Sequence, residues 1–373
     1  MKNKYKTMIY PFDVESVPLI RHNNLINNHN FLHVVSPNGW GISGKDAGFA
    51  DDGQTIGINV EKDFDNGLEN CDTVFFNAPS RKIDLEGFIY PKIIKAAENS
   101  KNIICTIKLE NDMIDKISCI CNENNKFFKY FTDSWDSIMS IPPTEQIYQI
   151  NTPIVFVIGL SERTHKFEIQ LNIRENLIEM GYKVSQVGTR HYCELMGFHS
   201  FPSFMYSKSI TESEKVTLFN HYIKKIEAKE QPDVIVIGIP GGTMPYNYEF
   251  TNRFGILAYE VSQAVKPDAV VLSTLYNKFS SDFFELISKS NKYKFGYSID
   301  CYNIANASLN VQTSQMTGVL EYTTMNWNFI NEKKKIYSTL DTPVYNILDT
   351  DDAKSMSNFL VNKLSEYADI EII

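Results

Sequence analysis

The sequence lacks a long apolar run, a basic run and the apolar core of a signal peptide. Its longest apolar stretches, such as PIVFVIGL at 153–160, are strand-sized and fall short of the roughly 18 residues of a membrane-spanning helix. The net charge of −9 gives no electrostatic footprint for DNA or RNA. The first residues, MKNKYKTMIYPFD, pass from charge straight into a predicted strand. We therefore expect a cytoplasmic protein that binds neither nucleic acid nor a membrane.

Cysteine is also sparse. Six cysteines occur in 373 residues, and a cytoplasmic protein would keep them reduced. Only Cys119 and Cys121 are close together, and no second Cys or His pair completes a zinc spacing, so we predict no metal site. What the chain does have is 43% apolar and 13% aromatic residues, enough to build two packed interiors.

Two series of alternating strand and helix patterns occupy the chain. The first includes a strand in YKTMIYPF, a helix over Glu15–Asn28 and a strand in QTIGINV at 54–60. The second includes a helix over Glu212–Glu230 and a strand in KYKFGYSID at 292–300. Short β-branched runs that alternate with helical periods indicate parallel sheets flanked by helices.

The proline-containing stretch SIPPTEQIYQINTP separates the two series and is typical of a linker. We therefore predict an α/β protein with two three-layer domains, at 1–135 and 153–373, joined by a linker at 136–152.

The loop GLSERTHKFE follows the first strand of the second domain, where a parallel sheet commonly holds phosphate. Lys166 lies seven residues after Gly159, at the start of a predicted helix. A nucleotide-hydrolysing P-loop has glycine before this lysine and Ser or Thr after it, whereas this chain has His165 and Phe167. The candidate ligand-binding residues of the loop are Gly159, Ser161, Thr164 and Lys166.

This spacing resembles the G-x5-G-K-T pattern of dethiobiotin synthetase and its relatives, and of a bacterial family that includes D-glutamate N-acetyltransferases. The segment PDVIVIGIPGGTMP, at 232–245, resembles the strand and turn that carry E-G-x-G-G in those proteins. The resemblance implies a Rossmann-like domain followed by a degenerate P-loop NTPase-like domain. Gly238 replaces the magnesium-binding Glu of the relatives, while Gly241 and Gly242 remain as candidate ligand contacts.

Two interpretations of the Lys166 loop remain open beside NTP hydrolysis, which the missing metal-binding groups disfavour. In one, the loop binds an anionic or polar ligand without hydrolysing it. In the other, Gly159 and Lys166 only shape the turn and cap the helix.

The segment GTRHYCELMGFHSFPSF follows the second strand of this domain and concentrates further candidates. An imidazole beside a thiol favours the thiolate, and residues two apart on a strand share one face. His191 and Cys193, with His165, are therefore candidate catalytic residues, and Arg190 is a candidate ligand contact. The alternative is that these residues serve polar loop packing or contact a ligand.

In the first domain, NGWGISGKDAG contains a G-x-G-x-x-G spacing that ends at Gly44 and is followed by Lys45. A dinucleotide fingerprint should follow the first strand and open a helix, but this motif follows the second strand and leads into loop-like residues. We expect a structured glycine loop that contacts a ligand or the other domain, with Trp40 as its apolar anchor.

The strings MIYPFDVESVPLIRHNNLI and VVSPNGWGISGKDAG resemble a clostridial family of peptide-maturation system proteins, and the resemblance covers essentially the whole chain. Members are encoded beside a bacteriocin-like precursor peptide, a radical-SAM maturase and an acyl-carrier-related protein, which are the partners that the resemblance implies. It implies a role in the maturation of a ribosomally synthesised peptide, without assigning a reaction.

Two functions follow from this family context. The first is a non-hydrolysing accessory protein that binds precursor, maturase or carrier. The second is an acyl- or group-transfer enzyme that draws on CoA or carrier-bound phosphopantetheine. An NTP-dependent enzyme ranks third, and no magnesium-nucleotide cofactor is expected. A homo-oligomer is left open.

Overall fold

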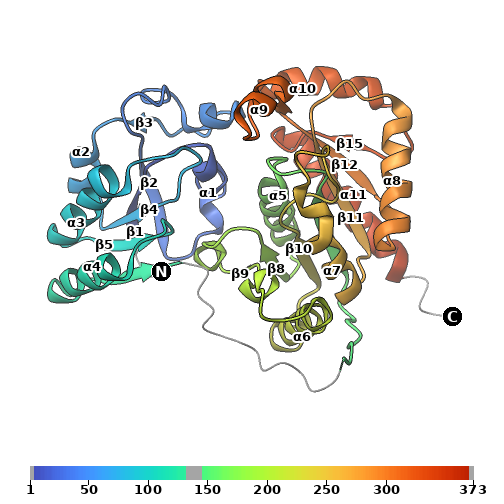
Figure 1. The fold of residues 1–373 in the computed structure, drawn as a ribbon, viewed down its shortest axis with the longest axis horizontal. Coiled ribbons are helices and arrows are strands. Elements are labelled where there is room, and N and C mark those ends of the chain that lie inside the picture. The colour runs from blue at the N-terminus through green and yellow to red at the C-terminus, as the bar shows by residue number, and fades with distance from the viewer. Residues whose placement is uncertain (1–3, 132–144, 369–373) are drawn as a thin grey trace. The chain divides into compact units, whose positions relative to one another are not determined.

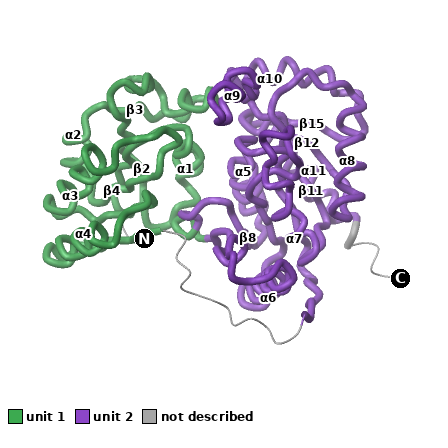
Figure 2. The backbone as a smooth tube through the Cα atoms, viewed as in Figure 1, with its two compact units in different colours: residues 1–134, 194–197 green, residues 135–193, 198–373 purple. Residues whose placement is uncertain are grey.

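The computed structural model describes residues 4–131 and 145–368. The chain divides into two compact units (Figure 2). The first comprises Met1–Ser134 and Glu194–Gly197, and the second comprises Trp135–Cys193 and Phe198–Ile373. Within the described part of the chain, no helix is long and apolar enough to cross a membrane.

The predicted linker falls partly outside the described residues, at 136–144. Its remainder lies along α6 (Glu212–Glu230) of the second unit. The backbone N–H groups of Asn151 and Thr152 both donate to the carboxylate of Glu227, at 2.6 and 2.8 Å. This end of the predicted linker is therefore held by hydrogen bonds to the second unit.

In the described residues of the first unit, six parallel strands form one sheet in the order β3-β2-β1-β4-β5-β6. The strands are β1 Tyr5–Tyr10, β2 His29–Val35, β3 Val60–Glu61, β4 Thr73–Phe76, β5 Asn102–Cys105 and β6 Phe128–Tyr130. The helices are α1 Val17–Arg21, α2 Phe64–Glu69, α3 Tyr90–Glu98 and α4 Asn111–Glu123. This strand order is that of Rossmann folds, with the topological switch beside β1.

Helices cover both faces of this sheet. Figure 1 shows α2, α3 and α4 on one side and α1 on the other. Met8 and Phe76 from the strands pack in one buried cluster with Phe64 of α2, Ile93 of α3 and Ile117 of α4. Burying each such side chain stabilises the fold by roughly 1.5–3 kcal/mol relative to its exposed state.

The second unit contains a parallel sheet in the order β15-β12-β11-β7-β10-β8-β9. Its strands are β7 Ile154–Gly159, β8 Val184–Gly188, β9 His199–Ser200, β10 Val234–Gly238, β11 Ala269–Leu275, β12 Cys301–Ala305 and β15 Val344–Tyr345. A separate antiparallel pair is formed by β13 Ala307–Leu309 and β14 Tyr322–Thr324, near the short helices α9 Val311–Thr317 and α10 Trp327–Lys334.

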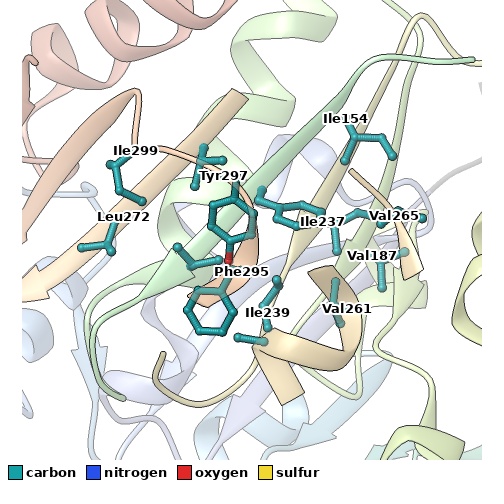
Figure 3. Packing of buried hydrophobic residues seen from close by; sticks show 14 of the residues in the cluster. Ile154, Val187, Ile237, Ile239, Val261, Val265, Leu272, Phe295, Tyr297 and Ile299 are labelled. Atoms are coloured by element: carbon teal, nitrogen blue, oxygen red, sulfur yellow. The ribbon is translucent and has the colours of Figure 1, made fainter. Parts of the chain in front are cut away.

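Two helical layers enclose the second sheet. One contains α5 Lys166–Glu179 and α11 Thr350–Ala368, whose residues Ile173 and Met356 pack against the strands. The other contains α6, α7 Ile256–Ala264 and α8 Ser281–Phe295. Figure 3 shows this second interior, in which Ile237 and Leu272 of the strands and Val261 of α7 belong to one buried cluster.

The predicted fold class is confirmed, since both units are three-layer α/β structures. The predicted helix over Glu212–Glu230 coincides with α6. Three local predictions were wrong. The helix predicted over Glu15–Asn28 contains α1 at Val17–Arg21 between short 3-10 turns. In the segment predicted as a strand at 54–60, only Val60 begins the short strand β3.

The third error concerns residues 292–300, predicted as a strand. They begin as the end of α8, which closes at Gly296 in a left-handed conformation with φ 87°. The strand β12 starts only at Cys301. Alternating burial of Phe295, Tyr297 and Ile299 mimics a strand pattern on a backbone that ends a helix.

Candidate functional site

The candidate site lies where the loop after β7 meets the loop after β10. Strand β7 is central in its sheet, between β10 and β11. Leu160 N–H donates to Ser273 O of β11 at 2.8 Å, and Thr243 N–H of the β10 loop donates to Gly159 O at 3.0 Å. In open parallel sheets, ligands bind at this carboxyl end of the strands, beside a topological switch.

Lys166 begins α5 and ties the two loops together. Its Nζ donates to Ser161 O at 3.1 Å and to Gly241 O at 2.6 Å, and the residue is 9% exposed. Burial lowers the pKa of Lys166 to about 8; Glu162 opposes this effect and the nearby Arg190 adds to it. Two cationic side chains, Lys166 and Arg190, therefore lie at this edge of the sheet.

The backbone around Lys166 has the geometry of an anion cradle. Arg163 and His165 both adopt the left-handed conformation, with φ 58°, which non-glycine residues rarely adopt. Backbones that alternate right- and left-handed residues turn successive N–H groups towards a common centre. Within the described residues, the N–H groups from Ser161 to Phe167 have no hydrogen-bond acceptor. The start of the 14-residue helix α5 adds its positive dipole end.

Glycine is required at two points of this cradle. A Cβ on Gly159 would lie 2.6 Å from Ser161 O and 2.7 Å from Lys166 Nζ. A Cβ on Gly242 would lie 2.8 Å from Leu160 O. The two loops approach each other closely only because these residues have no side chain. Gly241, with φ 78°, supplies the carbonyl that Lys166 holds.

The hydroxyl groups of the loop bond to its own backbone. Ser161 Oγ donates to Glu162 O at 3.2 Å, and Thr164 Oγ1 donates to Ser161 O at 3.3 Å. Ser273 Oγ of β11 donates to Thr164 O. These bonds fix the loop shape and leave its backbone N–H groups available.

Other side chains fill the positions at which the P-loop families that the sequence resembles hold magnesium. The ring of Phe167, which follows Lys166, packs against Tyr192 and Phe198, with centroids 5.8 and 6.4 Å apart. Gln170 is fully buried, and its amide occupies the space beside Gly238, where a Cβ would lie only 2.1 Å from Nε2. The residues present therefore do not fit a magnesium ion.

His165 is held by a residue that sequence reasoning missed. Its Nε2 lies 2.7 Å from Oδ1 of the fully buried Asn306, which follows β12. Gln170 was missed as well. The signal for it was Gly238 in place of a Glu, together with a long side chain one helical turn after Lys166. No sequence signal links His165 to Asn306, since 141 residues separate them.

His191 and Cys193 do not share a strand face, so the strand interpretation behind their pairing was wrong. Strand β8 ends at Gly188, and Cys193 opens a 3-10 turn over Cys193–Met196. His191 is exposed, whereas Cys193 is fully buried, with Sγ 2.6 Å from the position of a Cβ on Gly188. Burial disfavours the thiolate that nucleophilic catalysis requires. Their catalytic roles stay predictions.

Gly44 and Lys45 belong to the first unit and form part of a structured loop. Gly44, with φ 79°, donates its N–H to Val60 O at 2.8 Å, and Lys45 Nζ lies 3.8 Å from the Phe49 ring centroid. The next residue, Asp46, accepts the N–H groups of Gly48, Ile56 and Gly57 through its carboxylate. Burial raises the pKa of Asp46, but these hydrogen bonds outweigh it and hold the pKa below its usual range.

The predicted apolar anchor of this glycine loop is Trp40. It is half-buried, and the Arg81 guanidinium lies 5.4 Å from its ring centroid. The ligand contacts predicted for Gly44 and Lys45 stay predictions.

The first turn of the first unit carries a buried acidic side chain, where the Lys166 loop carries a basic one. Asp13 follows β1 and is 4% exposed. Its carboxylate accepts hydrogen bonds from Glu15 N–H at 3.0 Å, Ser80 N–H at 2.6 Å and Ser80 Oγ at 2.8 Å. Burial raises the pKa of Asp13, and the bonds from Ser80 oppose this rise. Dinucleotide-binding folds place pyrophosphate at this turn, where a second anion would be repelled.

The comparisons with known proteins bear on the fold alone. The structure of a DUF1611 family protein from Anabaena variabilis is similar with a TM-score of 0.59, over 97% of this chain and 100% of that one, at 9% identity. A GTPase in apo form from Pyrococcus abyssi has a TM-score of 0.29 over 55% of this chain and 84% of that one, at 15% identity. No family model and no curated protein matches the sequence. The chain thus has the fold of a DUF1611 family protein, and membership of the clostridial family stays a prediction.

Proposed function

We propose that this protein is a non-hydrolysing accessory component of a bacterial system that matures a ribosomally synthesised peptide. Its Lys166 loop binds an anionic group of a partner. One observation supports this best: the loop keeps a row of N–H groups that find no acceptor in the described part of the chain, while Phe167 and Gln170 fill the positions of the magnesium ligands.

The charge at the loop favours an anion. Successive N–H groups, the start of α5 and the ammonium of Lys166 all present positive charge to the same place. Arg190 adds a second cation nearby. The whole chain carries a net charge of −9, so this local excess does not follow from a generally basic surface. An anion at the loop would also compensate for the free-energy cost of burying the charged Lys166 ammonium.

Hydrolysis of a nucleoside triphosphate requires more than a cradle. Phosphoryl transfer depends on a magnesium ion that bridges the phosphates and neutralises the developing charge. The Phe167 ring offers no oxygen, and the neutral amide of Gln170 fills the space of a carboxylate. The loop is therefore suited to hold an anion and unsuited to cleave it.

Among the predicted partners, the acyl-carrier-related protein fits this chemistry best. A carrier's phosphopantetheine arm is attached through a phosphodiester, and CoA carries the same arm with further phosphates. Either would place an anion among the loop N–H groups. Precursor peptide and maturase remain partners by family resemblance.

The test is calorimetric titration of the purified chain with CoA, and with carrier protein in its pantetheinylated and unmodified forms. We expect CoA and the pantetheinylated carrier to bind, and Lys166→Met to weaken both at least tenfold. Lys289→Met is the matched control, because Lys289 is an exposed lysine of the same unit that forms an ion pair with Glu285. Failure of the chain to bind CoA, either carrier form and the precursor peptide would contradict the proposal.

The structure gives no specific support to acyl transfer, the other function predicted from sequence. Cys193 is buried, His191 is exposed, and His165 is hydrogen-bonded to Asn306. Mass spectrometry of precursor peptide incubated with the chain and acyl-CoA or acyl-carrier tests it. An added acyl mass that depends on the chain would revive this function, and an unchanged mass in the reconstituted system counts against it.

A further inference from the structure

A cleft of about 550 Å³ opens in the first unit, at a place that the Lys166 loop does not share. Lys62 and Asp63 line it from the turn between β3 and α2, and Phe64 from the start of α2. Lys92 and Lys95 line it from α3. The cleft therefore lies beside the carboxyl end of β3, on the edge of the sheet where parallel α/β folds bind ligands. Its volume is within the roughly 300–1,000 Å³ that is typical of small-molecule pockets.

Positive charge exceeds negative charge on the cleft wall. Of its two aspartates, Asp65 pairs with Lys95 at 2.8 Å. Asp63 caps α2 by accepting the N–H groups of Asp65 and Asn66 at 2.9 and 3.3 Å. Within the described residues, no carboxylate lies within 4 Å of the Lys62 or Lys92 ammonium. Two lysines therefore face the cleft without an ion pair.

Aromatic rings surround the Lys92 ammonium, and Asp65 attracts it without forming an ion pair within 4 Å in the described residues. Its Nζ lies 3.9 Å from the ring centroid of Phe88, and 5.8 and 5.9 Å from those of Tyr10 and Phe64. These cation–π contacts place the half-buried ammonium without using its N–H bonds. Its one hydrogen-bond acceptor in the described residues, Phe88 O, is at the long distance of 3.5 Å. Lys92 thus keeps donors for a ligand; burial lowers its pKa, Asp65 opposes this effect and Lys95 adds to it.

We propose that this cleft binds a small organic anion, whose phosphate or carboxylate group is held by Lys92 and Lys62 and whose apolar part packs on Phe64 and Pro91. The two lysines supply charge and hydrogen-bond donors. The rings hold Lys92 in place before the ligand arrives, so that less side-chain entropy is lost on binding. The site is independent of the proposed function, because it lies in the other unit and uses none of the same residues.

The experiment uses the full chain and three probes: inorganic phosphate, AMP and citrate. AMP adds a planar ring to a phosphate, whereas citrate offers only carboxylates. The probes therefore distinguish a site for phosphate groups from a site for carboxylate groups. Binding is followed by calorimetry and by protection of individual lysines from acetylation, read by mass spectrometry. We expect at least one probe to bind and to protect Lys92 and Lys62 from acetylation.

Variants locate the site. Lys92→Met keeps the stem and removes the charge, and we expect it to weaken binding at least tenfold. Lys62→Gln changes an exposed side chain, so the chain stays folded, and we expect binding to weaken about threefold. Lys116→Met on α4 is the control, because Lys116 is an exposed lysine of the same unit that does not line the cleft. All titrations are repeated in the Lys166→Met background, where the expected effects persist.

The outcomes are distinguishable from those of the proposed function. Binding that survives Lys166→Met and is lost in Lys92→Met supports the cleft. Binding lost only in Lys166→Met belongs to the other unit and overturns the inference. It is also overturned if none of the three probes binds, or if Lys62→Gln and Lys92→Met bind as the Lys116→Met control does.

Discussion

The two units share one architecture and place an acidic side chain in one, and a basic side chain in the other, at the same point of it. In each, the strand beside the topological switch ends in a turn that leads towards a helix. In the first unit this turn carries the buried carboxylate of Asp13, which receives three hydrogen bonds. In the second unit it carries Lys166 and a row of N–H groups without acceptors in the described residues. The fold thus determines where a ligand could lie, and a few side chains determine which charge is accepted there.

The two units use glycine differently, and a glycine-rich motif alone does not indicate which loop forms the cradle. The glycine-rich loop that ends at Gly44 lies in the first unit and has open space at each left-handed glycine. In the Lys166 loop, left-handed positions are filled by Arg163 and His165, and glycine is required at Gly159, where a Cβ would lie 2.6 Å from Ser161 O. The number of glycines therefore does not identify the cradle, since the left-handed residues of the Lys166 loop are Arg163 and His165.

The largest expected effect comes from breaking the cradle itself. Gly159→Ala places a Cβ 2.6 Å from the Ser161 carbonyl oxygen and 2.7 Å from Lys166 Nζ. Because the first of these is backbone, the loop has to shift, and we expect a loss of about 3 kcal/mol in the free energy of unfolding. Gly181→Ala is the control, with a left-handed φ of 93° but no atom within 4 Å, and should lose about 1 kcal/mol. Urea denaturation measures both, and equal losses would contradict the account.

A second comparison concerns the buried carboxylates of the two units. Glu260 on α7 is 3% exposed and faces Glu212, with Lys215 Nζ 3.9 Å from its carboxylate. Burial, and then the Glu212 carboxylate, raise the pKa of Glu260 from 4.5 to about 8. Between these values the folded state keeps a proton that the unfolded state loses, so the stability falls as the pH rises from about 4.5 to about 8.

Glu260→Gln should remove this pH dependence. The neutral amide needs no proton, so at pH 8.5 the variant should be more stable than the parent by on the order of 2 kcal/mol. Thermal unfolding at several pH values measures the effect. A parent chain whose stability rises between pH 5 and pH 8, with the variant following the same curve, would show that Glu260 is ionised in the folded state.

Asp13→Asn should affect the first unit less. An amide has one acceptor oxygen and presents N–H groups to the donors of Ser80, so we expect a loss of about 1–2 kcal/mol. Hydrogen exchange of peptides that cover residues 4–25 should quicken, while peptides around Lys166 stay unchanged. Asp84→Asn is the control, because Asn is as good a helix cap as Asp for the Gly87 N–H. Equal quickening in both variants would contradict the role of Asp13.

The smallest effect is expected at the glycine loop of the first unit. Gly44→Ala meets no atom within 4 Å and only acquires left-handed strain, of about 1 kcal/mol. It should leave the affinity for CoA unchanged, as read by the titration used for Lys166→Met. A tenfold loss of CoA affinity in Gly44→Ala would transfer the ligand site to this loop.

Much of the fold could be predicted from the sequence because its periodic segments are strong. The alternating strand and helix patterns gave both α/β units, and the helix over Glu212–Glu230 begins at a Thr211 capping box. Prediction failed where local pattern and backbone disagree. Residues 292–300 alternate like a strand although α8 continues to Phe295, and α1 stops at Arg21 despite a longer apolar pattern.

The site was predictable only in part, for a physical reason. Lys166 and Gly159 stand in one loop, and their spacing is visible in the sequence. The amide of Gln170 beside Gly238 and the bond from His165 to Asn306 depend on contacts between distant elements. Asp13 was overlooked because a carboxylate after a strand gives no motif, although its burial sets the charge of that turn.

The most direct test of the central claim is the affinity of the chain for ATP, measured by calorimetry with magnesium and again with EDTA. If the cradle holds an anion and the magnesium position is filled, both affinities should agree within about threefold, and Lys166→Met should lose both. No phosphate should be released in either condition. ATP binding that is more than tenfold tighter with magnesium, together with phosphate release that Lys166→Met abolishes, would contradict the account.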